Sequence, residues 1–230
     1  MDNFVSTVLN LKPRVAAFDC DGTLWSGDVG EAFFDWELSR NGFIPEPVAR
    51  AIRARHKDYK AGKVDEATMC GEMVTMHAGM TDSALRQAAE EFFPRIAANI
   101  FPELKELIGR LHAAGCEVWA VSSSNQWVIE AGAKHFGIPR TRILAAEVEV
   151  VDGVATDRLL RVPSGSGKPQ ALREVVKSDV DAAFGNSRWD AEMLAMAKHA
   201  FAVNPNLDLR LIAQQRGWTI YVPAGMQSKE

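Results

Sequence analysis

The sequence predicts an α/β protein built on a doubly wound parallel sheet, with a small helical region inserted after the first strand. Two observations support this. Short apolar segments alternate with segments of helical periodicity over residues 102–222, whereas residues 29–101 show helical periodicity only. Strands separated by helices of about ten residues favour a parallel sheet with helices on both faces.

The first strand is expected at residues 14–19 (RVAAFD), an apolar run that ends in acidic residues. Over residues 29–101, apolar side chains recur at helical spacing, and the segments 42–47 and 77–82 separate one helix from the next. Helix follows helix there without a strand, which predicts a helical insert of about 70 residues.

The remaining elements alternate. Helices are expected at 104–114, 126–136, 168–177 and 188–198, and strands at 117–121, 182–184, 200–203 and 218–222. Residues 143–154 contain two β-rich stretches with a turn at Asp152-Gly153, which predicts a hairpin. In a doubly wound sheet the ligand binds beyond the carboxyl ends of the strands, where Asp19, Ser122 and Asn186 would emerge.

Composition narrows the class of protein. The chain has 230 residues and a net charge of -4, so it has no general attraction to nucleic acid or to an anionic membrane. Cys20, Cys70 and Cys116 form no CxxC pair, which argues against a zinc site or disulfide framework and for reduced thiols. No apolar run is long enough to span a bilayer, and the N-terminus lacks the pattern of a signal peptide. A cytoplasmic location is expected.

The first candidate motif is Asp19-Cys20-Asp21-Gly22-Thr23. Gly22 allows a sharp turn, so both carboxylates can approach one centre. Carboxylate oxygens suit Mg²⁺, and an ionised aspartate can attack phosphorus when a metal offsets the repulsion between anions. The alternative is an acidic loop that caps the next helix.

Two further motifs suit an anion. Ser122 follows the strand at 117–121 and can bind a phosphate oxygen, although it can equally cap the next helix, as can Ser123 or Ser124. Lys168 opens a helix after the Gly-rich segment 164–167, where the helix dipole disfavours a lysine unless an anion is bound. Its alternative is a solvent-exposed lysine.

The fourth motif spans residues 185–190, GNSRWD. Asn186 offers a carbonyl oxygen to a hard cation, and Asp190 follows one helical turn later on the same side. A plain capping motif is the alternative.

Taken together and in this order, the four motifs resemble those of the haloacid dehalogenase superfamily: a DxDGT-like loop, a strand-end Ser/Thr, a Lys and an acidic GDxxxD-type loop. The helical insert is similar to the cap domain of the phosphoserine phosphatase-like branch. The resemblance implies a Rossmann-like core formed by residues 1–26 and 100–230 and a helical cap domain formed by residues 27–99.

The resemblance also implies roles for the acidic residues. Asp19 would attack the phosphoryl group and form an aspartyl-phosphate. Asp21 would protonate the leaving alcohol and later deprotonate the hydrolytic water. Mg²⁺ would be held by the Asp19 carboxylate, the Asp21 main-chain carbonyl and the Asn186 side chain.

Ser122 and Lys168 would neutralise and position the phosphoryl oxygens, and Asp190 would order either metal-bound water or Lys168. The expected function is a Mg²⁺-dependent phosphomonoesterase acting on a small phosphorylated metabolite. The alternatives are a phosphotransferase that passes the phosphoryl group to an alcohol, and a catalytically weak binding or regulatory protein. The oligomeric state stays open.

The sequence departs from the family pattern at a metal-binding position and at substrate-binding positions. Asn186 stands where the family usually has Asp, which predicts weaker Mg²⁺ binding. Asp28 lies nine residues after the nucleophile, where phosphoserine phosphatases have an acid that contacts the substrate amine. The cap arginine that would hold the serine carboxylate has no clear counterpart, and Arg53 and Arg55 are expected on solvated helix faces.

Three tryptophans, Trp25, Trp127 and Trp189, follow or lie in the motifs and are expected at one active-site mouth. With Asp28 they would receive a cationic head group through cation–π contacts. Substrates of the phosphoserine, phosphocholine or phosphoethanolamine type are therefore expected. The alternative is that the tryptophans pack cap against core. The five histidines are expected far from the motifs, on surface or helix faces.

Overall fold

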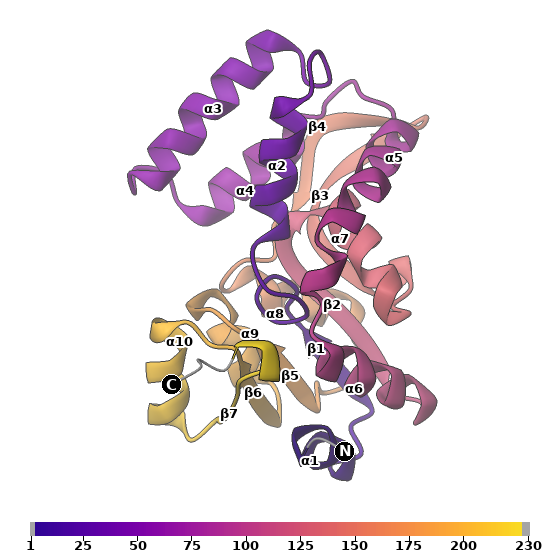
Figure 1. The fold of residues 1–230 in the computed structure, drawn as a ribbon, viewed down its shortest axis with the longest axis vertical. Helices are drawn as coiled ribbons and strands as arrows, with labels where there is room; N and C mark the ends of the chain where they lie inside the picture. Colours follow the sequence, from indigo (N-terminus) through magenta and orange to yellow (C-terminus); the bar gives the residue numbers. More distant parts are fainter. Residues whose placement is uncertain (1–2, 227–230) are drawn as a thin grey trace.

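The computed structural model describes residues 3–226, and within them seven strands form one sheet in the order β4-β3-β2-β1-β5-β6-β7 (Figure 1). The strands are β1 (Val15–Phe18), β2 (Glu117–Asn125), β3 (Ile143–Val151), β4 (Val154–Arg161), β5 (Ala182–Gly185), β6 (His199–Val203) and β7 (Thr219–Tyr221). All neighbouring strands are parallel except β3 and β4, which pair antiparallel as the predicted hairpin. The predicted doubly wound parallel sheet is confirmed.

Ten α-helices accompany the sheet in the described residues. They are α1 (Asn3–Asn10), α2 (Val29–Ser39), α3 (Glu46–Lys60), α4 (Glu66–Thr75), α5 (Asp82–Phe92), α6 (Pro102–Ala113), α7 (Gln126–Ala133), α8 (Gly167–Val175), α9 (Ala191–Met196) and α10 (Leu207–Arg216). None of the helices in this part of the chain has the length and apolar character needed to cross a membrane.

The central strand β1 shows why both faces of the sheet are covered. Its side chains alternate in direction, as strand geometry requires. Ala16 and Phe18 enter a buried cluster with α1, α6 and α7, whereas Val15 and Ala17 enter a second cluster with α8, α9 and α10. A strand buried on both faces needs apolar residues at every position, which explains the run VAAF.

The region between β1 and α6 is helical, as the sequence predicted, and contains α2–α5; the break between α3 and α4 was not expected. Helices α2, α3 and α4 lie together beyond the carboxyl end of β1, and α4 packs against the β3–β4 hairpin (Figure 1). The insert has a small core of its own, which includes Phe34, Ile52 and Met69. Its helix α5 packs against α7, and Leu85 and Phe92 belong to the same cluster as β1. The insert therefore rests directly on the sheet layer, and the domain boundaries at 26 and 100 stay a prediction.

The structure differs from the sequence-based assignment at three places. Helices α1 and α10 were not expected; α10 buries only Leu209 and Ala213, so its apolar periodicity is faint. The three serines after residue 121 belong to β2, where the pairing with β3 shifts register between Val121 and Asn125. The helix expected at 188–198 is a 3₁₀ turn (Arg188–Asp190) followed by the short α9.

Candidate active site

Asp19 is the first residue after β1, and its carboxylate is almost fully buried, with 5% of the residue exposed. Oδ1 accepts a hydrogen bond from Lys168 Nζ (2.7 Å), and Oδ2 accepts one from Thr23 Oγ1 (2.7 Å). Burial raises the pKa of Asp19 above its usual range and the charge of Asp190 adds to this effect, while Lys168 and Thr23 oppose it. The carboxylate is thus fixed at the strand end with its orientation set by two donors.

Lys168 is the cation of the site. It lies in the first turn of α8 with only 2% of its surface exposed, and its Nζ contacts Asp19 Oδ1 (2.7 Å), Asp190 Oδ1 (2.6 Å) and the Val121 carbonyl (3.0 Å). Burial alone would lower the pKa of this ammonium, but the two carboxylates raise it overall. Lys168 is therefore charged at neutral pH, and the solvent-exposed alternative is wrong.

Asp190 connects Lys168 to the loop after β5. While Oδ1 faces Lys168, Oδ2 accepts hydrogen bonds from the amides of Asn186 and Ser187, both at 2.9 Å. A Cβ at Gly185 would lie 2.4 Å from the Asp190 Cβ, so only glycine permits this close approach. The motif forms a capping box, as the capping alternative predicted. Its Asp190 carboxylate also binds the Lys168 ammonium.

Asp21 points in a different direction from Asp19. Its Oδ1 accepts hydrogen bonds from Trp25 Nε1 (2.8 Å) and the Val29 amide (2.7 Å), and its Oδ2 accepts one from Ser124 Oγ (2.7 Å). Burial raises the pKa of Asp21 to about 8, with a further contribution from the charge of Asp28, although the three donors favour the ionised form. A carboxyl group with this pKa can hold a proton near neutral pH and release it, as a general acid requires.

Ser122 is buried, and its Oγ accepts a hydrogen bond from the Ser124 amide (3.1 Å). The helix α7 is capped by Asn125 instead, whose side chain accepts from the Trp127 amide. Ser122 is thus not the helix cap.

A cavity of about 500 Å³ lies between the strand ends and the insert. It brings together eight of the nine predicted site residues: Asp19, Asp21, Asp28, Ser122, Lys168, Asn186, Trp189 and Asp190, the last reaching the site through Lys168 rather than lining the cavity. The insert contributes residues that the sequence did not single out, namely Glu31, His56, Tyr59, Glu66, Met69, Cys70 and Met73.

His56 corrects the expectation that every histidine lies far from the motifs. It lines the cavity, packs against Phe34 and Tyr59, and places Nε2 3.6 Å from Glu31 Oε1. A face of α3 that carries no motif approaches the catalytic loops only after the helices have packed, so no pattern in the sequence alone marks it.

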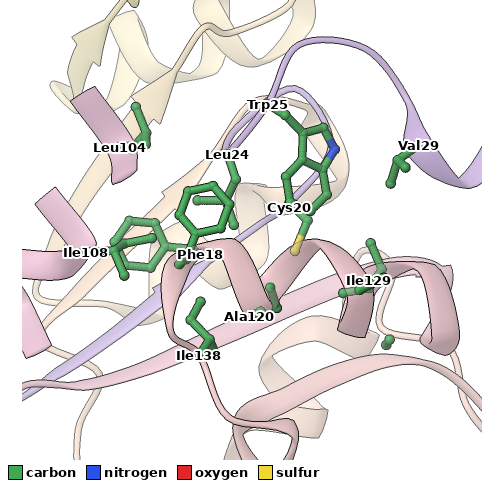
Figure 2. Close-up of a cluster of buried hydrophobic side chains, with 14 of the residues drawn as sticks. Phe18, Cys20, Leu24, Trp25, Val29, Leu104, Ile108, Ala120, Ile129 and Ile138 are labelled. Atoms are coloured by element: carbon green, nitrogen blue, oxygen red, sulfur yellow. The ribbon is translucent and has the colours of Figure 1, made fainter. Parts of the chain in front are cut away.

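Trp25 does not border the cavity, contrary to its assignment as a substrate-binding residue. It is fully buried among Cys20, Leu24 and Val29 (Figure 2) and meets Phe93 edge-to-face. Burial of the large apolar ring in the core is favourable, and its one polar group, the indole N–H, donates a hydrogen bond to Asp21 Oδ1.

Trp127 is buried in the same way, and its Nε1 donates to Asp82 Oδ1 (2.8 Å). Of the three tryptophans, only Trp189 lines the cavity, with the Arg188 guanidinium 4.3 Å from its ring centroid. The alternative of packing between cap and core therefore holds for Trp25 and Trp127.

The two candidate arginines do not reach the cavity either. Arg53 donates to the Leu38 carbonyl (2.6 Å), and Arg55 forms a bidentate pair with Glu72. Among the described residues that line the cavity, Lys168 is the only lysine or arginine.

The predicted magnesium ligands fit a hard cation. Asp19, Asp21 and Asn186 all line the cavity, and a Cβ at Gly22 would lie only 1.8 Å from Asn186 Nδ2, so the side chain of Asn186 rests against the catalytic loop. Within residues 3–226, no three His, Cys, Asp or Glu side chains form a metal cluster. Carboxylate, amide and main-chain oxygens together suit Mg²⁺, which takes few protein ligands and keeps several waters.

Comparison with known proteins agrees with this geometry. Residues 16–195 match the model of the haloacid dehalogenase-like hydrolase family. The chain is 29% identical over 215 residues to phosphoserine phosphatase SerB1 of Mycobacterium tuberculosis, covering 89% of this chain and 69% of that protein. It is 26% identical over 219 residues to a histidinol-phosphatase of Neisseria meningitidis serogroup C, covering 90% of this chain and 97% of that protein.

Among solved structures, a protein of unknown function from Bordetella pertussis Tohama I is similar, with a TM-score of 0.76 and 25% identity, covering 90% of this chain and 97% of that one. The family match includes the catalytic loop, the serine strand end, the buried lysine and the Asn186 loop. The chain therefore belongs to the haloacid dehalogenase-like hydrolase family, and it is a hydrolase of that family.

Proposed function

We propose that this protein is a Mg²⁺-dependent phosphomonoesterase that acts through an aspartyl-phosphate on Asp19. One observation carries the proposal: Asp19 and Asp21 line the same cavity but have different partners, since the carboxylate of Asp19 is paired with the Lys168 ammonium, whereas that of Asp21 accepts hydrogen bonds only from the neutral donors Trp25, Val29 and Ser124. Two carboxyl groups with separate environments can serve as nucleophile and acid/base in one reaction.

In this mechanism a carboxylate oxygen of Asp19 attacks phosphorus, and the bond from phosphorus to the ester oxygen breaks as Asp21 gives that oxygen its proton. Water then attacks the aspartyl-phosphate, Asp21 takes the proton from the water, and phosphate leaves. Lys168 and Ser122 stabilise the charge on the phosphoryl oxygens, and Asp190 holds Lys168 in place. Bound Mg²⁺, held by Asp19, the Asp21 carbonyl and Asn186, would neutralise phosphoryl charge.

The walls of the cavity support a leaving group that carries a positive charge. The insert side contributes Asp28, Glu31 and Glu66, of which Glu31 is already paired with Lys60. No arginine or lysine other than Lys168 lines the described cavity, so a carboxylate in the leaving group would find no cationic partner. We therefore favour phosphoethanolamine, phosphocholine or another amino-alcohol phosphate over phosphoserine.

The name of one relative agrees with this substrate class. One relative is named for phosphoserine and the other for histidinol phosphate, and only the second is the ester of an amino alcohol without a carboxylate. We further propose a cytoplasmic location, in keeping with the three unpaired cysteines.

A phosphate-release assay with Mg²⁺ tests the proposal across phosphoethanolamine, phosphocholine, histidinol phosphate, phosphoserine and a sugar phosphate. We expect a higher kcat/KM for the cationic esters without a carboxylate. Asp28→Asn, which preserves the cap of α2, should lower kcat/KM for those esters by about tenfold and leave the sugar phosphate nearly unchanged.

The assay contradicts the substrate class if phosphoserine is the best substrate, or if Asp28→Asn lowers kcat/KM equally for all esters. If no ester releases phosphate in the presence of Mg²⁺, the proposed phosphomonoesterase activity is wrong.

A further inference from the structure

The carboxyl group of Asp21 is held by three donors that come from three different parts of the chain. Trp25 belongs to the loop after β1, the Val29 amide opens α2, and Ser124 lies at the end of β2. The three donor–acceptor distances are 2.8, 2.7 and 2.7 Å. Both oxygens of Asp21 are therefore tied to the surrounding fold.

The two oxygens have different partners, and this difference assigns the proton. Oδ1 accepts from two N–H groups, the indole of Trp25 and the amide of Val29. An N–H group only donates, so an oxygen that accepts two such bonds is not the one that carries a proton. Oδ2 faces the hydroxyl of Ser124, which can donate to an ionised oxygen or rotate and accept from a protonated one.

Trp25 is fixed by packing rather than by polar contacts. Its ring is fully buried in the apolar cluster of Figure 2. It meets Phe93 at a centroid distance of 5.5 Å, and a Cβ at Gly132 would lie only 2.8 Å from Trp25 Cη2. The indole N–H therefore points at Asp21 Oδ1 whether or not substrate is present, since rotation would disrupt the core.

Ser124 is fixed as well. A Cβ at Gly30 would lie 2.3 Å from Ser124 Oγ, so the first turn of α2 closes over the hydroxyl. On the other side, the Ser124 amide donates to Ser122 Oγ (3.1 Å). The serine run that follows Val121 thus links the phosphoryl-binding residue to the acid/base residue.

We infer that Trp25 and Ser124 are positioning residues that present Asp21 Oδ2 to the ester oxygen as the proton-carrying atom. The inference rests on the proposed phosphomonoesterase function. In the first step a bond forms between Asp19 and phosphorus, the bond from phosphorus to the ester oxygen breaks with its electron pair on oxygen, and the proton on Asp21 Oδ2 passes to that oxygen. Hydrolysis of the aspartyl-phosphate returns a proton from water to the same Oδ2.

The dependence on the leaving group tests this assignment. An alkoxide leaves poorly without a proton, whereas p-nitrophenolate leaves readily without one. For Trp25→Phe and Ser124→Ala we expect kcat/KM for an alkyl phosphate to fall by about tenfold or more, and kcat/KM for p-nitrophenyl phosphate to fall by less than about threefold. Only the steps up to and including the first irreversible one determine kcat/KM, so the hydrolysis of the aspartyl-phosphate, which follows release of the alcohol, does not obscure the comparison.

Trp127→Phe is the matched control. Trp127 is equally buried and also donates its indole N–H to an aspartate, Asp82, at 2.8 Å, but neither residue lines the cavity. This variant should keep the wild-type ratio of the two kcat/KM values. A ratio that changes equally in Trp127→Phe would show that the effect comes from core packing.

The inference is overturned if Trp25→Phe and Ser124→Ala lower kcat/KM for both esters by the same factor, or lower neither. That result differs from a failure of the proposed function. In the latter case the wild-type protein itself would hydrolyse neither ester in the presence of Mg²⁺.

Discussion

The ammonium group of Lys168 lies between the carboxylates of Asp19 and Asp190, at 2.7 and 2.6 Å. One positive charge between two negative charges leaves an excess negative charge in a buried site, where uncompensated charge is unfavourable. A divalent cation would offset that excess and a phosphoryl group would then restore the balance. The position of Lys168 against the helix dipole, which the sequence already indicated, is explained by these two anions.

Asn186 sets how strongly the site holds Mg²⁺. Its amide oxygen is a neutral ligand, so Asn186→Asp adds a negative charge at the metal and should lower the Mg²⁺ concentration for half-maximal activity by roughly tenfold. Titrating phosphate release against Mg²⁺ in wild type and variant measures this. Identical Mg²⁺ requirements in wild type and variant would show that Asn186 is not a ligand of the metal.

Asn206→Asp is the control for charge alone. Asn206 lines the same cavity, but its side chain caps α10 by accepting from the Leu209 amide, and aspartate caps equally well. We expect a much smaller change in Mg²⁺ requirement for this variant. If Asn206→Asp lowers the Mg²⁺ requirement as much as Asn186→Asp does, then any negative charge added near the cavity strengthens Mg²⁺ binding, and Asn186 has no special role as a ligand.

At the scale of elements, α4 joins the insert to the sheet. At its start, Glu66 Oε1 accepts hydrogen bonds from Ser164 Oγ (2.7 Å) and Ser123 Oγ (3.4 Å). Just after its end, His77 Nε2 meets Glu37 Oε1 of α2 at 2.9 Å, and neither side chain is accessible to solvent. The position of the cavity wall thus depends on polar contacts at both ends of one helix.

The pair His77–Glu37 predicts a dependence of stability on pH. Burial would lower the pKa of His77, but Glu37 and the Val74 carbonyl raise it above 6.5 overall. The folded state then keeps a proton that the unfolded state loses, so the stabilisation is complete below about pH 6.5 and is lost as pH rises through the folded-state pKa. Within that window the free energy of unfolding should fall by up to about 1.4 kcal/mol per pH unit relative to His77→Gln.

Urea unfolding at several pH values measures the difference between wild type and His77→Gln. His135→Gln is a control of opposite sign, because burial and Lys105 lower the pKa of His135, so its contribution is lost as pH falls below about 6.5. A difference between wild type and His77→Gln that is independent of pH would contradict a protonated His77 in the folded protein.

At the scale of the whole molecule, the parallel sheet decides which site residues a sequence can reveal. Asp19 and Asn186 directly follow strands, and Ser122 lies in β2 where its pairing with β3 shifts register. Parallel strands deliver residues near their carboxyl ends to one edge of the sheet whatever the surrounding loops do. Their meeting could therefore be predicted from the order of strands and helices alone.

Residues whose position depends on helix packing could not be predicted. His56 and Glu66 lie on helices of the insert and reach the cavity only because α4 packs against β2, β3 and β4 and α3 packs against α4. Trp25 illustrates the same limit: its place after the catalytic loop led to the wrong prediction that it binds substrate, because only the packed core determines that the ring points inward and the N–H toward Asp21. Spacing along the sequence does not encode the direction of such a side chain.

The central claim is that Asp19 carries the phosphoryl group during turnover. Acid quenching during turnover of an amino-alcohol phosphate with Mg²⁺, followed by peptide mapping by mass spectrometry, tests it directly. We expect a hydroxylamine-sensitive phosphoryl group on Asp19 in the wild-type protein and none in Asp19→Asn, which should release no phosphate above background. A phosphoryl group on another residue, or unchanged phosphate release by Asp19→Asn, would contradict it.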